Sequence, residues 1–242
     1  NMQKQIRDIK RQPHAIIATP GRLNDLVNRG ILSLGNVSTF ILDEADRMLD
    51  MGFSKEIEKI GNFLPKERQT LCFSATMDKK AKDLIDKYLK ENRVEISVVK
   101  NETNDHIEQD VVKFKDRDHK IELLKDMLDQ PDFEKVLIFS ETKHAAQKLS
   151  DHLSKNNLPS VSIHGNKSQS QRQRALKQFK TKINIMVATD VAARGLDIDD
   201  ISHVINLEQP QTYEDYVHRI GRTGRGGKNG KALTFVDEKH FR

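Results

Sequence analysis

The sequence has very little cysteine and no tryptophan: its 242 residues include a single cysteine, Cys72. A single thiol excludes a framework of disulfides and favours a reducing compartment, so we expect a cytoplasmic location. Long apolar runs are also lacking. The run at 136–139 is far shorter than the roughly 20 residues that span a bilayer, and we expect no membrane association. The charged residues near the start, such as Lys4 and Arg7, predict that no secretory signal is present.

Both basic and acidic residues are common. Lysine and arginine number 41 and aspartate and glutamate number 36, which gives a net charge of +5. This small basic excess permits a polyanionic partner but does not establish one. The nine histidines have no spacing typical of zinc ligands, so no zinc site is expected. Hydrophobic residues make up 36% of the chain and cluster in short periodic runs, which favours a folded protein over a disordered one.

Short apolar runs alternate with amphipathic stretches along the chain, and this pattern predicts strands and helices in turn. The predicted strands lie at 14–19, 40–43, 69–74, 93–99, 107–114, 136–140, 161–164, 183–189, 203–207 and 232–236. The predicted helices lie at 78–91, 119–128, about 146–153, 169–179 and 213–220. Such alternation is typical of an α/β fold in which helices cover both faces of a parallel sheet.

A polar stretch without periodicity, residues 100–106, divides this alternation into two parts. We therefore expect two α/β units, residues 1–99 and 107–242, joined by a short linker. In parallel sheets, functional side chains gather beyond the carboxyl ends of the strands. Several polar motifs of this sequence follow predicted strands, and these motifs are the candidate sites.

An acidic tetrad at 43–46 follows the apolar residues 40–42. In that position Asp43 suits the binding of Mg²⁺, usually through water, beside the phosphates of a nucleotide. Glu44 suits a base that orients and deprotonates an attacking water. Acidic residues are also common at the start of a helix, where they interact favourably with the helix dipole. Considered alone, the tetrad favours this second explanation.

Two further loops follow predicted strands of the first half. Gly21 lets the backbone approach a phosphate and Arg22 offers a fork of donors, although a turn that ends the strand explains the same residues. The hydroxyls of Ser74 and Thr76 suit a relay of position between the acidic tetrad and the second unit, or a plain helix cap.

Two segments of the second half carry similar signals. In the loop at 188–198, Thr189 suits contact with a nucleic-acid phosphate and Asp197 contact with a ribose hydroxyl, and helix capping explains both about equally well. In the segment at 218–225, three arginines recur at three-residue spacing and two glycines interrupt them. The glycines argue against a regular solvated helix face. Arginines in such a place suit a phosphate clamp that stabilises charge at a γ-phosphate.

Together and in this order, the motifs resemble those of the DEAD-box family of ATP-dependent RNA helicases. The segments that carry the resemblance are 19–22, 43–46, 74–76, 137–142, 164–172, 188–198 and 218–225. The resemblance implies two RecA-like parallel-sheet domains that use ATP and Mg²⁺ and take RNA as their partner. It also implies that ATP closes the two domains on the RNA backbone and that short duplexes are unwound locally. Binding is then dependent on salt and largely independent of sequence.

The resemblance implies roles for single residues on the nucleotide side. Asp43 is expected to hold Mg²⁺ and Glu44 to activate water. Arg222 and Arg225 are expected at the γ-phosphate, and His218 is expected to bridge toward the acidic tetrad and the Ser-Ala-Thr segment.

The resemblance also implies contacts to the rest of the ligands. Gly195 and Asp197 are expected to line the nucleotide from the second domain. The residues expected to contact the RNA backbone are Thr19, Gly21, Arg22, Gln169, Arg172 and Thr189. The resemblance names no protein partner.

One element of the family pattern is missing. The family has a glycine-rich phosphate loop, G-x-x-x-x-G-K-[ST], before the acidic tetrad, and none occurs in these 242 residues. We therefore expect the first RecA-like domain to be incomplete at its N-terminus. An alternative to the RNA-dependent ATPase is then that this chain alone acts only as an RNA-binding module. A DNA-directed relative of the same superfamily is a third alternative, because phosphate contacts scarcely distinguish the two backbones.

Overall fold

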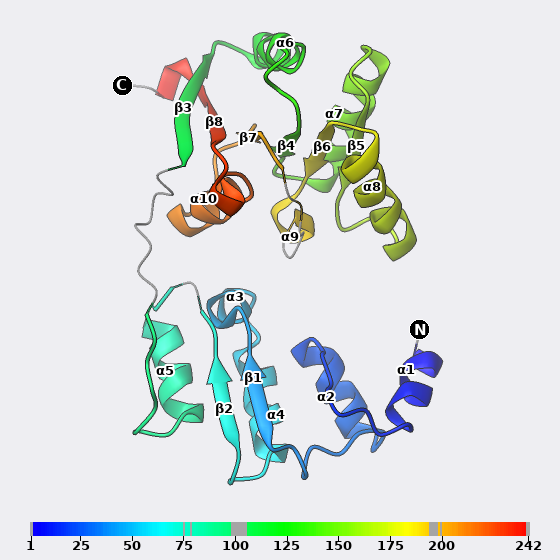
Figure 1. Cartoon of the computed structure of the whole chain (residues 1–242), viewed down its shortest axis with the longest axis vertical. Helices are drawn as coiled ribbons and strands as arrows, with labels where there is room; N and C mark the ends of the chain where they lie inside the picture. Colours follow the sequence, from blue (N-terminus) through cyan, green and yellow to red (C-terminus); the bar gives the residue numbers. More distant parts are fainter. Residues whose placement is uncertain are drawn as a thin grey trace. The chain divides into compact units, whose positions relative to one another are not determined.

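The structure is a computed structural model (Figure 1) that describes residues 2–74, 76, 77, 79–97, 106–193, 198 and 200–240. The chain divides into two compact units, Asn1–Ser97 and Val98–Arg242. Of the predicted linker at 100–106, all residues but His106 lie outside the described part. The predicted domain limits, 1–99 and 107–242, stay a prediction.

In its described residues, the first unit is built around a two-stranded parallel sheet. Its elements are α1 (Met2–Ile9), α2 (Pro20–Asn28), β1 (Thr39–Leu42), α3 (Ala45–Asp50), α4 (Ser54–Phe63), β2 (Gln69–Cys72) and α5 (Lys79–Tyr88). Strands β1 and β2 pair in parallel, so that Leu42 lies opposite Cys72. The core joins this sheet to α3, α4 and α5 through the buried residues Leu42, Ala45, Leu49, Ile57, Ala81 and Leu84.

Among the described residues, only one face of this sheet is covered. Side chains alternate along a strand, so Ile41 points away from the face to which the buried Leu42 contributes, and Ile41 is 53% exposed. Phe73, directly after β2, is 55% exposed. The prediction that helices cover both faces is therefore wrong for the described part of this unit, because α3, α4 and α5 share the core on the Leu42 side.

Two predicted strands of this unit are not formed. Residues 14–19 pair with no other described segment, and Ile17 is fully exposed. Residues 93–97 likewise form no strand, and Val94 and Ile96 are largely exposed, whereas residues 98 and 99 lie outside the described part. An apolar run becomes a strand only where a neighbouring backbone supplies the hydrogen-bond ladder, and a local sequence pattern does not reveal that neighbour.

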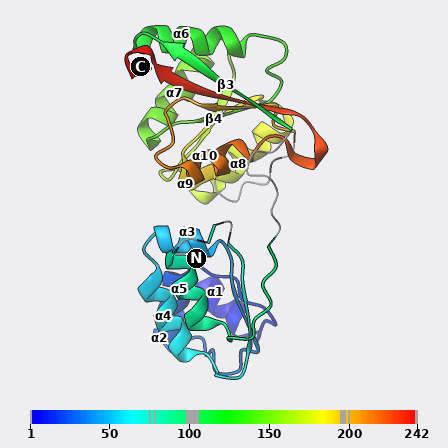
Figure 2. The ribbon, with the colours of Figure 1, turned by 90° about the vertical axis from the view of Figure 1, so that its left-hand side faces the viewer.

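The described residues of the second unit form a six-stranded parallel sheet with helices between the strands. Its elements are β3 (Ile107–Phe114), α6 (Arg117–Leu128), β4 (Val136–Phe139), α7 (Lys143–Lys155), β5 (Ser160–Ile163), α8 (Gln169–Thr181), β6 (Ile185–Ala188), α9 (Asp190–Ala193), β7 (His203–Asn206), α10 (Tyr213–Ile220) and β8 (Gly230–Asp237). The strand order is β3-β8-β7-β4-β6-β5, and every described pair is parallel. Figure 2 shows the long strands β3 and β8 side by side.

Helices cover both faces of this sheet, as the sequence predicts. On one face Val136 and Ile138 pack with α6 and α7, and on the other Leu137 and Phe139 pack with α8 and α9. All four residues of β4 are buried, as expected for a central strand with a continuous apolar sequence. No helix in the described ranges is both long and apolar enough to cross a membrane.

Candidate functional site

The acidic tetrad lies at the turn between β1 and α3. Asp43 and Glu44 are exposed, whereas Leu42 before them and Ala45 after them are buried. The amide of Glu44 donates to Asp43 Oδ1 at 3.0 Å, and the amide of Ala45 donates to the carbonyl of Phe73 at 3.0 Å. The second bond ties this turn to the end of β2. Two carboxylates are therefore presented to solvent from a turn that is anchored on both sides.

Glu44 has a left-handed backbone, with φ 52° and ψ 51°, and it precedes the first residue of α3. This conformation costs a non-glycine residue roughly 1–2 kcal/mol, and such residues cluster at functional sites. A residue in this conformation turns the chain sharply between strand and helix. Because this turn directly follows β1, it places the Glu44 side chain just beyond the end of that strand.

Asp46, the last residue of the tetrad, has a different environment. It is 7% exposed, and its Oδ2 accepts from the amide of Thr76 at 2.9 Å and from Thr76 Oγ1 at 3.2 Å. Its own amide donates to Ser74 Oγ at 3.3 Å, and Ser74 Oγ donates to the Thr76 carbonyl at 2.7 Å. Asp46 thus holds the tetrad against the Ser74–Thr76 segment, whose middle residue, Ala75, lies outside the described part.

These contacts divide the tetrad into two exposed carboxylates and one structural carboxylate. Mg²⁺ keeps several of its waters and takes one or two carboxylates in nucleotide sites. Asp43 provides a hard oxygen donor of this kind at a strand end, with Glu44 exposed beside it, so the residues present fit the expected ion. Asp46 does not fit, because its Oδ2 is occupied by Thr76.

The predicted RNA contacts of the first unit lie at the start of α2. Thr19 precedes the helix in an extended conformation, and Pro20 occupies the first turn. Gly21 and Arg22 are exposed, and a Cβ at Gly21 would meet no atom within 4 Å. Arg22 Nη1 lies 3.2 Å from Asp25 Oδ2. Helix N-termini suit anion binding because their first amides lack partners within the helix.

In the second unit, Gln169 and Arg172 lie in the first turn of α8. Ser168 caps this helix through a reciprocal capping box with Gln171. Gln169 is exposed. Arg172 Nη2 donates to the carbonyl of Ala192 on α9 at 3.3 Å. Because the amide of Ala192 donates to the carbonyl of Thr189, the structure brings Arg172 close to the loop of Thr189.

Thr189 directly follows β6 and is 9% exposed. Its carbonyl accepts from the amides of Ala192 and Ala193 and so begins the short helix α9. The two predicted nucleotide contacts further along this loop, Gly195 and Asp197, lie outside the described residues.

The predicted γ-phosphate residues lie at the end of α10 and just beyond it. Arg222 Nε donates to the carbonyl of His218 at 3.3 Å, and Arg225 Nε donates to that of Gly221 at 2.9 Å. Both arginines therefore fold back along the end of the helix, and all three predicted side chains come from one short segment. Between them Thr223 is 1% exposed, and its Oγ1 donates to the carbonyl of Ile201, which anchors this segment to the residues before β7.

Two residues that are not among the predicted site residues, Thr223 and Arg219, also organise this site. The motif groups Arg219 with the arginines that suit a phosphate clamp, but the structure buries it. Arg219 is 4% exposed and forms a bidentate ion pair with Asp190. One local signal was available, because Arg219 follows the partly buried Tyr216 by three residues on α10. Of the three regularly spaced arginines, the buried Arg219 lies within α10, and the half-buried Arg222 and Arg225 lie beyond its end.

His164, at the end of β5, is another buried polar residue of the second unit. It is 5% exposed, and its Nε2 lies 3.1 Å from Gln147 Oε1, which also accepts from Ser162 Oγ. Burial lowers the pKa of His164 from its ordinary value of 6.5, and the nearby Lys167, His144 and Lys143 lower it further. We therefore expect a neutral His164 at pH 7, in a surrounding that is rich in cations.

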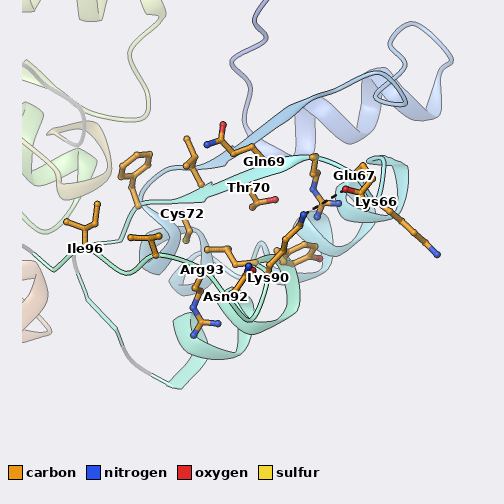
Figure 3. Close-up of a pocket in the computed structure, with 15 residues that line it drawn as sticks. Lys66, Glu67, Gln69, Thr70, Cys72, Lys90, Asn92, Arg93 and Ile96 are labelled. Atoms are coloured by element: carbon orange, nitrogen blue, oxygen red, sulfur yellow. Dashed lines mark ion pairs between the residues drawn. The ribbon is translucent and has the colours of Figure 1, made fainter.

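A separate groove of about 900 Å³ lies in the first unit, between β2 and the chain that follows α5 (Figure 3). Figure 3 shows its mixed lining, from Gln69, Thr70 and Cys72 on one side to Lys90, Asn92 and Arg93 on the other. Burial raises the pKa of the half-buried Cys72 thiol, and Asp46 raises it further. Within the described residues, the lining includes none of the predicted site residues, so the groove is not part of the candidate site.

Comparison with known proteins agrees with this architecture. Residues 1–84 match the family described as DEAD/DEAH box helicase, and residues 119–227 match the helicase conserved C-terminal domain. The chain is 44% identical over 237 residues to the DEAD-box ATP-dependent RNA helicase CshA of Geobacillus kaustophilus, and the alignment covers 98% of this chain and 50% of that relative.

Two solved structures are similar to this chain. One is S. cerevisiae Dbp5 bound to RNA and ADP BeF3, with a TM-score of 0.79 and 32% identity over 92% of this chain and 59% of that chain. The other is a hypothetical ATP-dependent RNA helicase from Sulfolobus tokodaii, with a TM-score of 0.54 and 32% identity over all of this chain and 70% of that chain.

The parallel sheets, the polar loops at strand ends and these neighbours define a helicase of the RecA-like type, which confirms the predicted fold class. The chain belongs to the DEAD-box helicase family. It spans about half the length of the curated relatives it matches.

Proposed function

We propose that the protein containing this chain is an RNA-dependent ATPase that locally unwinds short RNA duplexes. In this proposal ATP drives the closure of the two units on the RNA backbone. The observation that carries the proposal is the turn after β1, where Asp43 and Glu44 present two carboxylates from a strained but anchored backbone. Two acidic groups at a strand end suit two parts of phosphoryl transfer to water, the binding of Mg²⁺ and the orientation of the attacking water.

On the nucleotide side, Asp43 would hold Mg²⁺ through water, and the ion would neutralise charge on the β- and γ-phosphates of ATP. Glu44 would orient the attacking water and accept its proton. Arg222 and Arg225 would stabilise the charge that develops on the γ-phosphate, and His218 would connect their segment to the acidic tetrad. Gly195 and Asp197 are proposed to line the nucleotide.

On the RNA side, the proposed contacts are to the backbone. Thr19, Gly21 and Arg22 would bind a phosphate at the start of α2, where exposed amides and an arginine fork meet. Gln169, Arg172 and Thr189 would bind the backbone on the second unit, which is supported by the bond between Arg172 and α9. Such contacts make affinity fall with salt and depend little on sequence.

Several coarser expectations belong to the same proposal. The single cysteine favours a reducing, cytoplasmic setting. The two functional domains would correspond to 1–99 and 107–242, joined at 100–106. The relative from Geobacillus kaustophilus is named as ATP-dependent and as an RNA helicase, which supports ATP and RNA as the ligands here.

The experiment that tests this proposal is the substitution Glu44→Gln in the natural protein that carries these residues. Gln keeps the size and the turn but cannot accept the proton, so we expect RNA-stimulated ATP turnover to fall by about 10²-fold or more, with RNA affinity retained. Glu67→Gln is the matched control, because Glu67 is 95% exposed at a site outside the proposed machinery. Turnover that is the same in Glu44→Gln and wild type would contradict the role of Glu44.

One alternative has a specific observation in its favour. No G-x-x-x-x-G-K-[ST] loop occurs in the 242 residues, so this chain alone would act only as an RNA-binding module. ATP turnover of the 242-residue chain, measured beside that of the natural protein, separates the two: activity confined to the natural protein supports the alternative for the chain alone. Competition between matched RNA and DNA strands tests the DNA-directed alternative.

A further inference from the structure

Arg219 makes four hydrogen bonds through its guanidinium group. Its Nε and Nη2 donate to the two carboxylate oxygens of Asp190 at 2.7 and 2.8 Å. Its Nη1 donates to Asn206 Oδ1 at 3.2 Å and to the carbonyl of Glu208 at 2.8 Å. The guanidinium carbon lies 5.1 Å from the centre of the Phe139 ring. Every nitrogen of the guanidinium is thus engaged.

Three of these partners lie at or just beyond the ends of three different strands. Phe139 ends β4, Asp190 follows the end of β6, and Asn206 ends β7. Arg219 itself lies on α10, so one side chain joins this helix to the ends of three strands in the middle of the sheet. The junction is rigid, because a bidentate arginine–carboxylate pair fixes both distance and orientation.

The sequence neighbours of the pair are the proposed ligand contacts. Asp190 is bonded to Thr189, the proposed RNA contact, and its helix α9 also receives the bond from Arg172. Arg219 lies three residues before Arg222 in the sequence. Thr223, the residue after Arg222, is bonded to the carbonyl of Ile201, before β7. The ion pair is therefore the direct link between the proposed RNA loop and the proposed phosphate segment within this unit.

Stability alone is a weak explanation for this pair. The Arg219 side chain is 5% exposed and that of Asp190 is 29% exposed, so the arginine loses its hydration, and this cost offsets much of the attraction between the two charges. A buried pair of this kind fixes geometry more than it stabilises the fold, and here the geometry joins two sites.

We propose that the Arg219–Asp190 ion pair is a positioning pair that transmits RNA contact at Thr189 to Arg222 and Arg225, and so makes ATP turnover respond to RNA. This inference rests on the proposed function. A shift of the Thr189 loop on RNA binding moves the Asp190 carboxylate. The paired guanidinium then moves α10 and the arginines at its end.

The test measures ATP turnover of the natural protein with and without saturating RNA, together with the KM for RNA, in the substitution Asp190→Asn. Asn keeps the shape and loses the charge. We expect the ratio of the two turnover rates to fall about tenfold, with RNA-free turnover and the KM for RNA within about twofold of wild type. The matched control is Asp126→Asn, the same change of side chain at an exposed position of α6 that is not part of this junction.

Arg219→Lys provides a second variant in case Asp190→Asn is poorly folded by thermal unfolding. Lysine keeps the charge but not the bidentate fork, so it is expected to lower the ratio as well. If RNA-free and RNA-stimulated turnover fall by the same factor in the folded variant, the pair is only structural and the inference is overturned. If wild-type turnover shows no response to RNA, the proposed function is overturned, and the inference with it.

Discussion

Asp46 and Thr76, thirty residues apart in the sequence, are joined by two hydrogen bonds, from the Thr76 amide at 2.9 Å and from its hydroxyl at 3.2 Å. The pair locks the segment after β2 to the start of α3. It also explains why only part of the acidic tetrad is available to a ligand: Asp46 is turned inward, and Asp43 and Glu44 are left at the surface.

This relationship predicts the effect of Thr76→Val. The substitution removes the hydroxyl donor and keeps the shape and the amide bond, so we expect the free energy of unfolding to fall by about 1 kcal/mol. Chemical denaturation of the chain measures it. Thr39→Val, at an exposed position at the start of β1, is the control and is expected to change stability by less than about 0.5 kcal/mol. Equal stability of Thr76→Val and wild type would show that the hydroxyl bond contributes nothing.

The left-handed backbone of Glu44 predicts a conflict between stability and activity. Glycine adopts this conformation without a Cβ clash, so we expect Glu44→Gly to raise the free energy of unfolding by up to about 1 kcal/mol while ATP turnover is lost. Asn157→Gly is the matched control, because Asn157 also has a positive φ, of 61°, and lies after α7, outside the proposed machinery. The control is expected to leave turnover unchanged. A large loss of stability in Glu44→Gly would show that the strain is not in the backbone.

A substitution at Gly21 can test RNA binding without disturbing the packing of the protein. Its φ is not in the left-handed region and a Cβ would meet no atom within 4 Å, so neither backbone nor packing requires glycine there. We expect Gly21→Ala to leave stability unchanged or to raise it by less than about 1 kcal/mol, because alanine favours helices. RNA affinity is expected to fall several-fold, because the methyl group keeps a phosphate from the backbone.

Two other glycines serve as controls for this prediction. Gly35→Ala, in a loop where the nearest atom to a Cβ lies at 3.7 Å, is expected to affect neither quantity. Gly61→Ala is expected to lower stability, because a Cβ there would collide with the ring of Tyr88. Fluorescence titration with a labelled RNA measures the affinity. Wild-type affinity in Gly21→Ala would remove Gly21 from the proposed RNA site.

Acid is expected to destabilise the second unit through His203. This residue is 5% exposed, its ring is stacked on Phe133 at 3.9 Å, and its Nδ1 lies 3.0 Å from Ser202 Oγ. Burial lowers the pKa of His203 from its ordinary value of 6.5 and outweighs the opposite effect of Asp132. Below pH 6.5 the unfolded chain therefore binds a proton that the folded chain does not, so stability decreases as the pH falls from 6.5 toward the lowered pKa.

The measurement is the free energy of unfolding between pH 7.5 and pH 5. We expect His203→Gln to reduce the pH dependence, and His14→Gln, at an exposed position of the first unit, to leave it unchanged. His164, whose pKa is also lowered, accounts for part of the dependence that remains. A pH profile of His203→Gln that coincides with that of wild type would contradict the role of His203.

Much of the second unit is predictable from local sequence. The predicted strand at 107–114 and the predicted helix at 213–220 have the bounds of β3 and α10 in the structure. Each has flanking signals that act over a few residues, such as Thr212, which caps α10 through its side chain. The strands β4, β6 and β7 can likewise be predicted from their apolar sequences, because a central parallel strand is apolar on both faces.

The first unit shows where this reasoning fails. The runs at 14–19 and 93–97 have the composition of strands, yet neither pairs with a described segment. Strand formation needs a partner backbone, and no local pattern specifies one. For the same reason the sequence did not indicate that one face of the β1–β2 sheet leaves Ile41 and Phe73 exposed among the described residues.

The sequence by itself determined most elements of the second unit, the residues at the strand ends and the family, because these follow from short periodic patterns and fixed motifs. Only the tertiary structure decided which members of each motif are available. Asp46 has the same side chain as Asp43, and Arg219 the same side chain as Arg222 and Arg225. Asp46 and Arg219 are nevertheless buried, because Thr76 and Asp190, distant along the chain, bind them. Burial and hydrogen bonding depend on residues that folding brings together, so no local pattern contains them.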